Sequence, residues 1–405
     1  MLYKINNMKN YFEISSRLTG STSVEIVRSL YHTIDWRQRL IGILGARGTG
    51  KTTLMLQFIK QNYTNPTDAL YVSLDKMVLF NQSLYEVADW FYKSGGAHLF
   101  LDEVHKYPTW AMEVKSIYDD FPSLKIVFSG SSALLLQKAE ADLSRRASVY
   151  RLHNLSFREF IHFNSGLEFP QVTLDDILQN HIGIATNINL KIRPLAHFGE
   201  YLATGAYPYY FENKVLYFER VAATVKTIIE SDLMAIGSFS YSSLISMQKV
   251  LSMIADSVPF KPNISELSRK AGIARDILLR MIDLLARADL LMTLRQSSMP
   301  TGYLTKPEKL YLQNTTLAGA LSFNRQPDTG SVRETFFLNQ VGYGHQVTMP
   351  DAGDFLVDNH YTFEIGGSNK TSRQIRGIEN CFVVQDNIET GFGNVIPLWL
   401  FGFLY

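Results

Sequence analysis

Residues 45–52 read Gly45-Ala46-Arg47-Gly48-Thr49-Gly50-Lys51-Thr52, and this stretch decides how the first part of the chain is organised. An apolar run at residues 40–44 precedes it, and a helical pattern at residues 53–59 follows it. The three glycines allow the backbone to turn with its N–H groups pointing inward, so loop and helix start form a concave anion site. Every fixed position of the phosphate-binding P-loop pattern is occupied.

The loop predicts that ATP or ADP binds here together with Mg²⁺. Lys51 would reach the β- and γ-phosphates, and the hydroxyl of Thr52 would ligate the metal ion. The alternative is a glycine-rich turn without a ligand, which the order of strand, loop and helix disfavours. The nucleotide-binding residues expected from the pattern are Gly45, Arg47, Gly48, Thr49, Gly50, Lys51, Thr52 and Thr53.

Length, charge and cysteine content limit the function classes. The chain has 405 residues, which is too long for one core and suggests two or three domains. Its 39 basic and 38 acidic side chains nearly cancel, so no overall field attracts nucleic acid or a membrane, and any such binding must be local. Cys381 is the sole cysteine, which excludes an intrachain disulfide and a cysteine-based zinc site.

No segment of the sequence predicts a membrane span or a secretory signal. The first residues lack the apolar core of a signal peptide. Residues 396–405 are very apolar but far short of the ~20 residues that cross a bilayer. We therefore expect a cytoplasmic protein in which this final stretch is a buried strand or a packing tail, and membrane anchoring is the less favoured alternative.

The region from residue 40 to about residue 152 predicts an α/β fold. Short apolar runs alternate with helical segments there, which is typical of a parallel sheet with helices on its faces. A separate lead-in helix is expected around residues 24–31, beside the nucleotide site. The expected strands are residues 40–44, 69–73, 98–101, 125–129 and 148–152, and the expected helices lie near 51–62, 81–93, 108–118 and 132–140.

Two adjacent carboxylates, Asp102 and Glu103, follow the third expected strand. Ligands of parallel sheets bind at the carboxyl ends of the strands, where this pair would lie. Asp102 would hold Mg²⁺, and Glu103 would be the base that orients the attacking water in γ-phosphate hydrolysis. A solvated strand end is the alternative, which the preceding complete P-loop disfavours.

A serine and an arginine would complete the site. Ser129 ends the fourth strand and would sense the γ-phosphate or fix the water, whereas Ser131 and Ser132 would instead cap the next helix. Arg145 and Arg146 precede the last strand. Arg146 is the candidate for stabilising transition-state charge, in cis or from a neighbouring molecule, and the alternative is a solvated basic turn.

These motifs, with residues 128–132 and the run at residues 150–160, resemble the AAA-type ATPase family of bacteria and archaea, and the similarity extends over nearly the whole chain. Members carry a C-terminal domain of unknown function. The resemblance implies a core sheet in the order 5-1-4-3-2, a catalytic glutamate, and an arginine after the sensor strand that matches Arg146. The family often has Gly-Arg where this chain has Arg145-Arg146.

Two helical regions follow the core. Residues 153–235 predict a helical lid or linker, and residues 236–300 predict a winged helix whose second helix lies at 275–287. That helix would enter a DNA major groove, or the module would have a structural or protein-docking role. Residues 264–295 hold six basic and four acidic side chains, and this surplus of two favours the structural role because it neutralises few phosphates.

Residues 301–405 carry Glu334 on an expected helix, Asp354 at a hairpin and Glu364 on an expected strand. These residues resemble the metal-binding set of the restriction-endonuclease fold, and the region resembles a degenerate form of that fold. Gly366 stands where its lysine would stabilise the attacking hydroxide, although Lys370 could swing back from the following loop. A structural domain without activity is favoured over a Mg²⁺-dependent nuclease.

The sequence therefore predicts an ATPase that acts as a nucleotide-dependent conformational switch. Its alternatives are an ATP-regulated DNA-binding protein and a DNA nuclease that uses the C-terminal domain. The expected partners are ATP and an unidentified protein, with double-stranded DNA and a second copy of the chain as further candidates. The expected domains are residues 1–39, 40–152, 153–235, 236–300 and 301–405, and the expected catalytic residues are Lys51, Glu103, Ser129 and Arg146.

Overall fold

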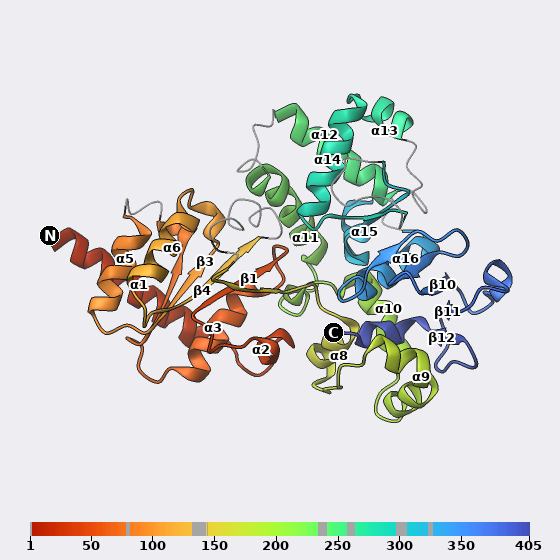
Figure 1. The fold of residues 1–405 in the computed structure, drawn as a ribbon, viewed down its shortest axis with the longest axis horizontal. Helices are drawn as coiled ribbons and strands as arrows, with labels where there is room; N and C mark the ends of the chain where they lie inside the picture. Colours follow the sequence, from red (N-terminus) through yellow and green to blue (C-terminus); the bar gives the residue numbers. More distant parts are fainter. Residues whose placement is uncertain are drawn as a thin grey trace. The chain divides into compact units, whose positions relative to one another are not determined.

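The chain folds into two compact units, Met1–His153 and Asn154–Tyr405. The computed structural model describes residues 2–77, 82–131, 143, 145–233, 241–256, 264–296, 306–322 and 327–405. Figure 1 shows helices and strands in both units. Among the described helices, none has the length and apolar character to cross a membrane.

A five-stranded parallel sheet forms the centre of the first unit. Its order is β2-β3-β4-β1-β5, which is the expected order 5-1-4-3-2 seen from the other edge, so this prediction is confirmed. The strands coincide with the expected apolar runs to within two residues. They are β1 (Leu40–Gly45), β2 (Ala69–Ser73), β3 (His98–Asp102), β4 (Lys125–Ser131) and β5 (Ser148–Arg151).

Three helices of this unit lie within three residues of the expected bounds 51–62, 81–93 and 108–118, whereas the short helices after β2 and β3 were not expected. The expected helix around residues 24–31 is wrong, because a long helix precedes it and residues 24–29 are irregular. In that segment the guanidinium of Arg28 donates to two backbone carbonyls near the P-loop, and such tertiary contacts override helical periodicity. The helix expected at 132–140 lies outside the described residues. The helices are α1 (Leu2–Ser21), α2 (Leu30–Thr33), α3 (Lys51–Asn62), α4 (Leu74–Met77), α5 (Leu84–Lys93), η2 (Val104–Lys106) and α6 (Trp110–Asp120).

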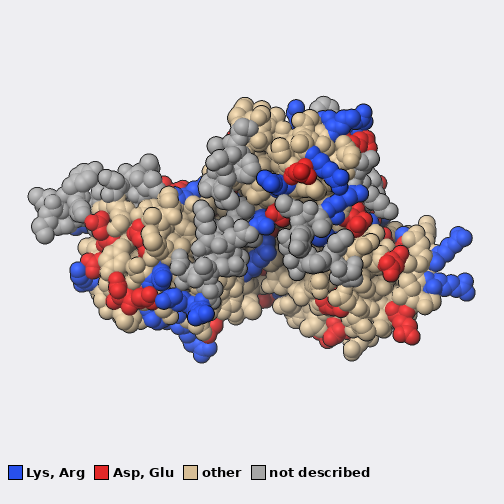
Figure 2. All heavy atoms as spheres, turned by 45° about the horizontal axis from the view of Figure 1, so that its top comes forward, with Lys and Arg blue, Asp and Glu red and all other residues tan. Residues whose placement is uncertain are grey.

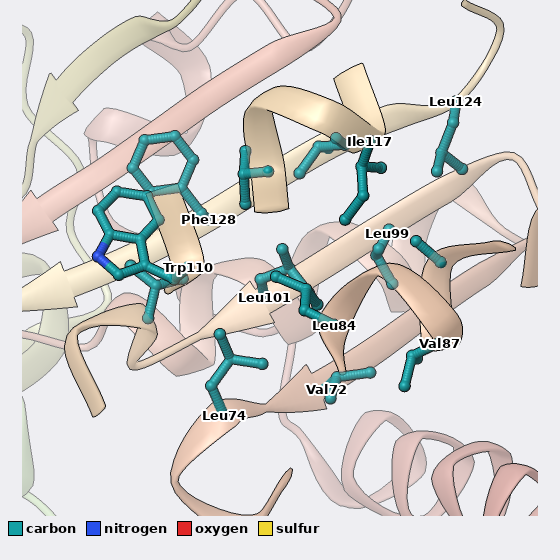
Figure 3. Close-up of a cluster of buried hydrophobic side chains, with 14 of the residues drawn as sticks. Val72, Leu74, Leu84, Val87, Leu99, Leu101, Trp110, Ile117, Leu124 and Phe128 are labelled. Atoms are coloured by element: carbon teal, nitrogen blue, oxygen red, sulfur yellow. The ribbon is translucent and has the colours of Figure 1, made fainter. Parts of the chain in front are cut away.

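Alternate residues of the strands enter two separate cores, one on each face of the sheet. In β3, Leu99 and Leu101 lie in the core that α5 and α6 cover, as Figure 3 shows. Phe100 lies in the opposite core, against α3. Because side chains alternate along a strand, every second residue of the central strands points toward α3. This parity decides which polar side chains reach the start of α3.

The second unit begins with helices, as expected for residues 153–235. They are α8 (Phe157–Ser165), α9 (Leu174–Asn189), α10 (Pro194–Thr204), η3 (Pro208–Tyr210), α11 (Tyr217–Thr227) and η4 (Ile228–Asp232). Capping boxes at Ser156 and Thr173 fix the starts of α8 and α9. The role of this region as a lid stays a prediction.

Among the described residues, three further helices and one strand lie in residues 236–300, the region expected to be a winged helix, and the partner of that strand follows this region. They are α12 (Tyr241–Ala255), α13 (Ile264–Ala271), α14 (Arg275–Arg287), β6 (Leu291–Leu294) and its antiparallel partner β7 (Lys309–Leu312). Gly272, with φ 71°, forms the turn between α13 and α14. On the face drawn in Figure 2, basic and acidic side chains of the described residues are interspersed. A winged helix and its binding to DNA stay predictions.

A mixed five-stranded sheet in the order β12-β11-β10-β9-β8 follows. The final residues form a buried 3-10 helix after a short strand, so the expected apolar tail packs inside the unit. A nuclease-like fold is not confirmed. The elements are α15 (Thr315–Leu321), α16 (Thr329–Val341), β8 (Val347–Thr348), β9 (Phe355–Val357), β10 (Tyr361–Gly366), η5 (Ser372–Ile375), β11 (Cys381–Gln385), β12 (Val395–Pro397) and η6 (Leu398–Phe403).

Candidate active site

The loop between β1 and α3 has the backbone that its glycines predict. Gly48 has φ 84° and Gly50 has φ 97°, and both values lie in the left-handed region that glycine adopts without strain. At Gly45 a Cβ atom would lie 2.1 Å from the carbonyl oxygen of Leu152, so any side chain there would collide with backbone. The glycines therefore allow both the turn and its close approach to the end of β5.

Two cations hold the loop in place. Nζ of Lys51, a residue only 5% exposed, donates to the carbonyl oxygens of Gly45 at 2.9 Å and Ala46 at 2.8 Å. The buried guanidinium of Arg28 donates to the carbonyl of Thr49 at 2.5 Å and to that of His153 at 2.8 Å. Sequence reasoning missed Arg28, because one arginine in an irregular segment belongs to no motif.

Asp102 is the centre of the site. Thr52 Oγ1 and the hydroxyl of Tyr71 each donate to Asp102 Oδ2 at 2.6 Å. The hydroxyl of Ser129 donates to Asp102 Oδ1, to which the N–H of Glu103 also donates at 3.1 Å. Strand parity explains the convergence, since Tyr71, Asp102 and Ser129 continue the positions that face α3.

The pairing of Thr52 with Asp102 tests whether the expected Mg²⁺ ligands fit. Their oxygen atoms lie 2.6 Å apart, on the first turn of α3 and at the end of β3. A hydroxyl and a carboxylate are both hard oxygen donors, which Mg²⁺ prefers. The donor set therefore fits the ion, and these two residues could hold it.

Tyr71 is a site residue that the sequence did not single out. Burial, with the negative charge of Asp102 as the second cause, holds the pKa of Tyr71 well above its usual value. The phenol is therefore protonated at neutral pH and acts as a donor. Its strand gives no motif, but an inward-facing hydroxyl on the strand next to Asp102 would have been the signal once the sheet order was fixed.

Glu103 departs from the strand immediately after Asp102. It has φ 55° and ψ 43°, a left-handed conformation that is uncommon for a residue other than glycine. Its Oε2 lies 3.2 Å from Nε2 of His105 in the following 3-10 turn, and its side chain is 21% exposed. Such backbone strain is found at functional positions more often than elsewhere. His105 is a second neighbour that sequence reasoning missed.

The structure does not bring Arg146 to this group. Its guanidinium pairs with Asp119 near the end of α6, with two N–O distances of 3.2 Å. Arg146 precedes β5, whose first residue, Ser148, pairs with Ile41 near the start of β1. The P-loop follows the carboxyl end of β1, so Arg146 lies near the amino ends of the strands, away from the P-loop. The expectation that it completes the site in cis therefore has no support from its position.

The other expected residues divide by exposure. Arg145 and Thr53 are exposed, and Arg47 is half-buried within the loop. Thr53 lies on α3 one residue beyond the hydroxyl that contacts Asp102. The nucleotide-binding roles assigned to the loop residues stay predictions.

The second unit assembles the three carboxylates that resemble a nuclease site, together with two lysines. Nζ of Lys309 lies 3.1 Å from Glu334 Oε2 and 3.7 Å from Asp354 Oδ1. Nζ of Lys370 lies 2.5 Å from Oε1 of the fully buried Glu364. Sequence reasoning missed Lys309, which lies far from these acids in the chain and belongs to no motif.

Lys370 does swing back over the glycine that replaces the expected lysine. A Cβ atom on Gly366 would lie 2.6–2.7 Å from three carbons of the Lys370 side chain. The stem of Lys370 therefore fills the space beside Gly366, and its ammonium reaches Glu364.

The charges of the cluster act on Glu364. Burial raises the pKa of Glu364, the ammonium of Lys370 opposes that rise, and the carboxylates of Asp354 and Glu334 add to it. Among the described residues, no group of three or more His, Cys, Asp or Glu side chains is arranged to hold a metal ion. The geometry of the carboxylates with their lysines is thus that of a set of ion pairs.

Comparison with known proteins adds family matches for two segments. Residues 37–161 match the model of an AAA domain, and residues 195–328 match a domain of unknown function (DUF8612). The chain is 24% identical over 369 residues to an uncharacterized protein of Methanocaldococcus jannaschii, and the match covers 84% of this chain and 78% of that protein.

Among solved structures, the chain is similar to AMPPCP-bound DnaA from Aquifex aeolicus, with 17% identity, a TM-score of 0.27, and coverage of 65% of this chain and 91% of DnaA. It is also similar to the S. cerevisiae Hsp104–ADP complex, with 16% identity, a TM-score of 0.29, and coverage of 65% and 39%. TM-scores this low carry no argument. The similarity to AAA domains rests on the family match of residues 37–161, with which the observed sheet order agrees.

Proposed function

We propose that the first unit binds ATP with Mg²⁺ and hydrolyses it, and that the nucleotide state switches the conformation of the chain. One observation carries this proposal. Thr52 Oγ1, at the start of α3, lies 2.6 Å from Asp102 Oδ2 at the end of β3. The ammonium of Lys51 lies against the loop that precedes α3. The P-loop and carboxylate motifs, which are ~50 residues apart in sequence, are thus in contact, and this supports a shared site.

Binding would use the loop and Lys51. The ammonium of Lys51 already lies against two loop carbonyls, and phosphate oxygens offer it stronger, charge-assisted partners. The start of α3 adds backbone N–H groups and the positive end of its dipole. Thr52 and Asp102 would hold Mg²⁺, which neutralises phosphate charge when it is bound.

Hydrolysis would depend on Glu103 and Ser129. Glu103 would accept the proton of the attacking water, because it directly follows Asp102 at the end of β3. The backbone N–H of Glu103 donates to Ser129 Oγ at 3.3 Å. This serine therefore connects Glu103 to β4, the strand between β3 and β1. Arg146 would instead contribute to the nucleotide site of a second copy of the chain, which is the other role that the sequence predicts for it.

The proposal is tested by measuring phosphate release from ATP by the full chain. We expect turnover with Mg²⁺ and none with excess EDTA, because charge neutralisation by the ion is required. Asp102→Asn is the matched variant, and it should lower turnover at every Mg²⁺ concentration. Tight ATP binding without phosphate release would contradict hydrolysis, and the absence of any ATP binding would contradict the whole proposal.

We expect Tyr71→Phe to raise the Mg²⁺ concentration needed for half-maximal ATPase activity by about tenfold, because residues that orient metal ligands typically contribute 10–100-fold. Tyr71 is a positioning residue: its hydroxyl fixes Asp102 Oδ2, which faces Thr52. ATP affinity in EDTA should not change. A Mg²⁺ titration of ATPase activity measures the effect.

Tyr63→Phe is the control for that substitution. Its hydroxyl bonds to Nδ1 of His98 at 2.6 Å, on the same face of the sheet but at the opposite end of β3. It loses a hydrogen bond of similar length without contact to Asp102. If both variants shift the Mg²⁺ titration equally, Tyr71 acts only on stability and is not a positioning residue.

A further inference from the structure

The acidic centre of the second unit, defined as Glu334, Asp354 and Glu364, is filled by lysine. The Glu334 and Asp354 side chains are only 12% and 17% exposed, and Lys309, which lies between them, is 6% exposed. Tyr311 donates a further hydrogen bond to Glu334 Oε2 at 2.6 Å. The ammonium of Lys309 thus lies between a carboxylate oxygen on α16 and one on the residue that precedes β9.

Lys309 is fixed in this position by the fold. It belongs to β7 and pairs in register with Leu294 of β6. Asp354 is also oriented, because its Oδ2 accepts the N–H of Ile365 at 2.8 Å and thereby leaves Oδ1 toward Lys309. The ammonium is therefore a tethered cation, which cannot leave the centre as a solvent ion can.

Glu364 offers the acidic centre a carboxylate oxygen that its ion pair does not use. The residue is 0% exposed, and its Oε1 faces Nζ of Lys370. No hydrogen-bond donor lies at its Oε2 among the residues that the structure describes. A buried carboxylate oxygen without a donor is costly unless a cation is nearby. Three carboxylates and two lysines leave one net negative charge, which attracts a divalent ion weakly.

We infer that Lys309 acts as an internal cation that takes the place of a divalent metal between Glu334 and Asp354 and closes the acidic centre to Mg²⁺. The residues that resemble a metal-binding set thus form a latent metal site. The second unit would fold without metal, and the Lys309 side chain would block metal-dependent cleavage of DNA. Removing that side chain should open the centre to a divalent ion, because the carboxylate oxygens that remain are hard ligands.

Binding of Mn²⁺ to the full chain, followed by electron paramagnetic resonance, tests the inference. All variants carry Asp102→Asn so that the first unit does not contribute. Lys309→Met should bind one Mn²⁺ ion at the centre, and the parent should bind Mn²⁺ there at least tenfold more weakly. Adding Glu364→Gln to Lys309→Met should remove that binding.

Lys370→Met is the matched control, since it also deletes an ammonium but leaves Lys309 between Glu334 and Asp354. It should not acquire Mn²⁺ binding. The inference is overturned if the parent already binds Mn²⁺ as tightly as Lys309→Met does and loses it with Glu364→Gln, or if folded Lys309→Met binds none. Lys309→Gln is the second variant, should the methionine variant not fold. Mn²⁺ that restores folding of either variant supports the inference, and failure of Mn²⁺ to do so counts against it.

Discussion

Replacing Glu103 with glutamine should leave ATP bound to the full chain and lower its hydrolysis by at least about 100-fold, since a general base contributes about 10²–10⁴-fold. The amide has the size of the carboxylate but cannot take a proton from water. The loop, Thr52 and Asp102 are unchanged by the substitution, so binding should persist. Phosphate release measures turnover, and chromatography of the nucleotide retained after gel filtration shows whether it is ATP or ADP.

The position of Glu103 makes this substitution informative. Its backbone is left-handed and its N–H contacts Asp102 Oδ1, neither of which requires the carboxylate charge. Loss of turnover in Glu103→Gln would therefore report on chemistry and not on folding. Glu25→Gln, at an exposed residue of the same unit, controls for the loss of one negative charge. Turnover equal to the wild type would exclude Glu103 as the base.

The sequence predicts the first sheet well because its signals are local. Each strand is a short apolar run between turns, and β2 has its predicted bounds, Ala69–Ser73. A strand buried on both faces has no alternation to misread. The P-loop could be placed for the same reason, since strand, glycines and helix lie within one continuous stretch.

The remaining parts of the site depend on which strands become neighbours. Tyr71 reaches Asp102 only because β2 lies beside β3 and both strands present these residues to α3. The position of Arg146 depends on strand pairing in the same way. Its distance in sequence from the sensor strand does not show at which end of the strands it lies, and the pairing of β5 with β1 places it near their amino ends.

The ion pairs between residues far apart in the chain could not be predicted from the sequence either. Lys309 lies in a strand of another sheet, so no spacing rule connects it with Glu334 or Asp354. The lysine missing at position 366 could be sought in the next loop because a loop can turn back and a flexible lysine stem can then reach the site. The structure shows that Lys370 does cover it, since its carbons occupy the space beside Gly366.

Replacing Lys51 with alanine should weaken ATP binding by about 10- to 150-fold, because a hydrogen bond to a charged group contributes about 1.5–3 kcal/mol. The substitution removes the ammonium with its stem and its hydrogen bonds to the carbonyls of Gly45 and Ala46, whereas Arg28 still contacts the loop and Gly48 and Gly50 keep the backbone turn. Titration with a fluorescent ATP analogue in EDTA measures the affinity without a metal contribution. Hydrolysis should fall together with binding, whereas Glu103→Gln should separate the two.

Lys60→Ala is the matched control for Lys51→Ala. Both lysines belong to α3, but Nζ of Lys60 donates to the carbonyls of Gly20 and Thr22 at the other end of the helix. Its loss changes the charge of the unit equally and leaves the loop intact. If Lys51→Ala keeps the wild-type affinity, or loses no more than Lys60→Ala, phosphate is not bound by this loop. The pairing of Thr52 with Asp102 would then serve only to join α3 to the sheet.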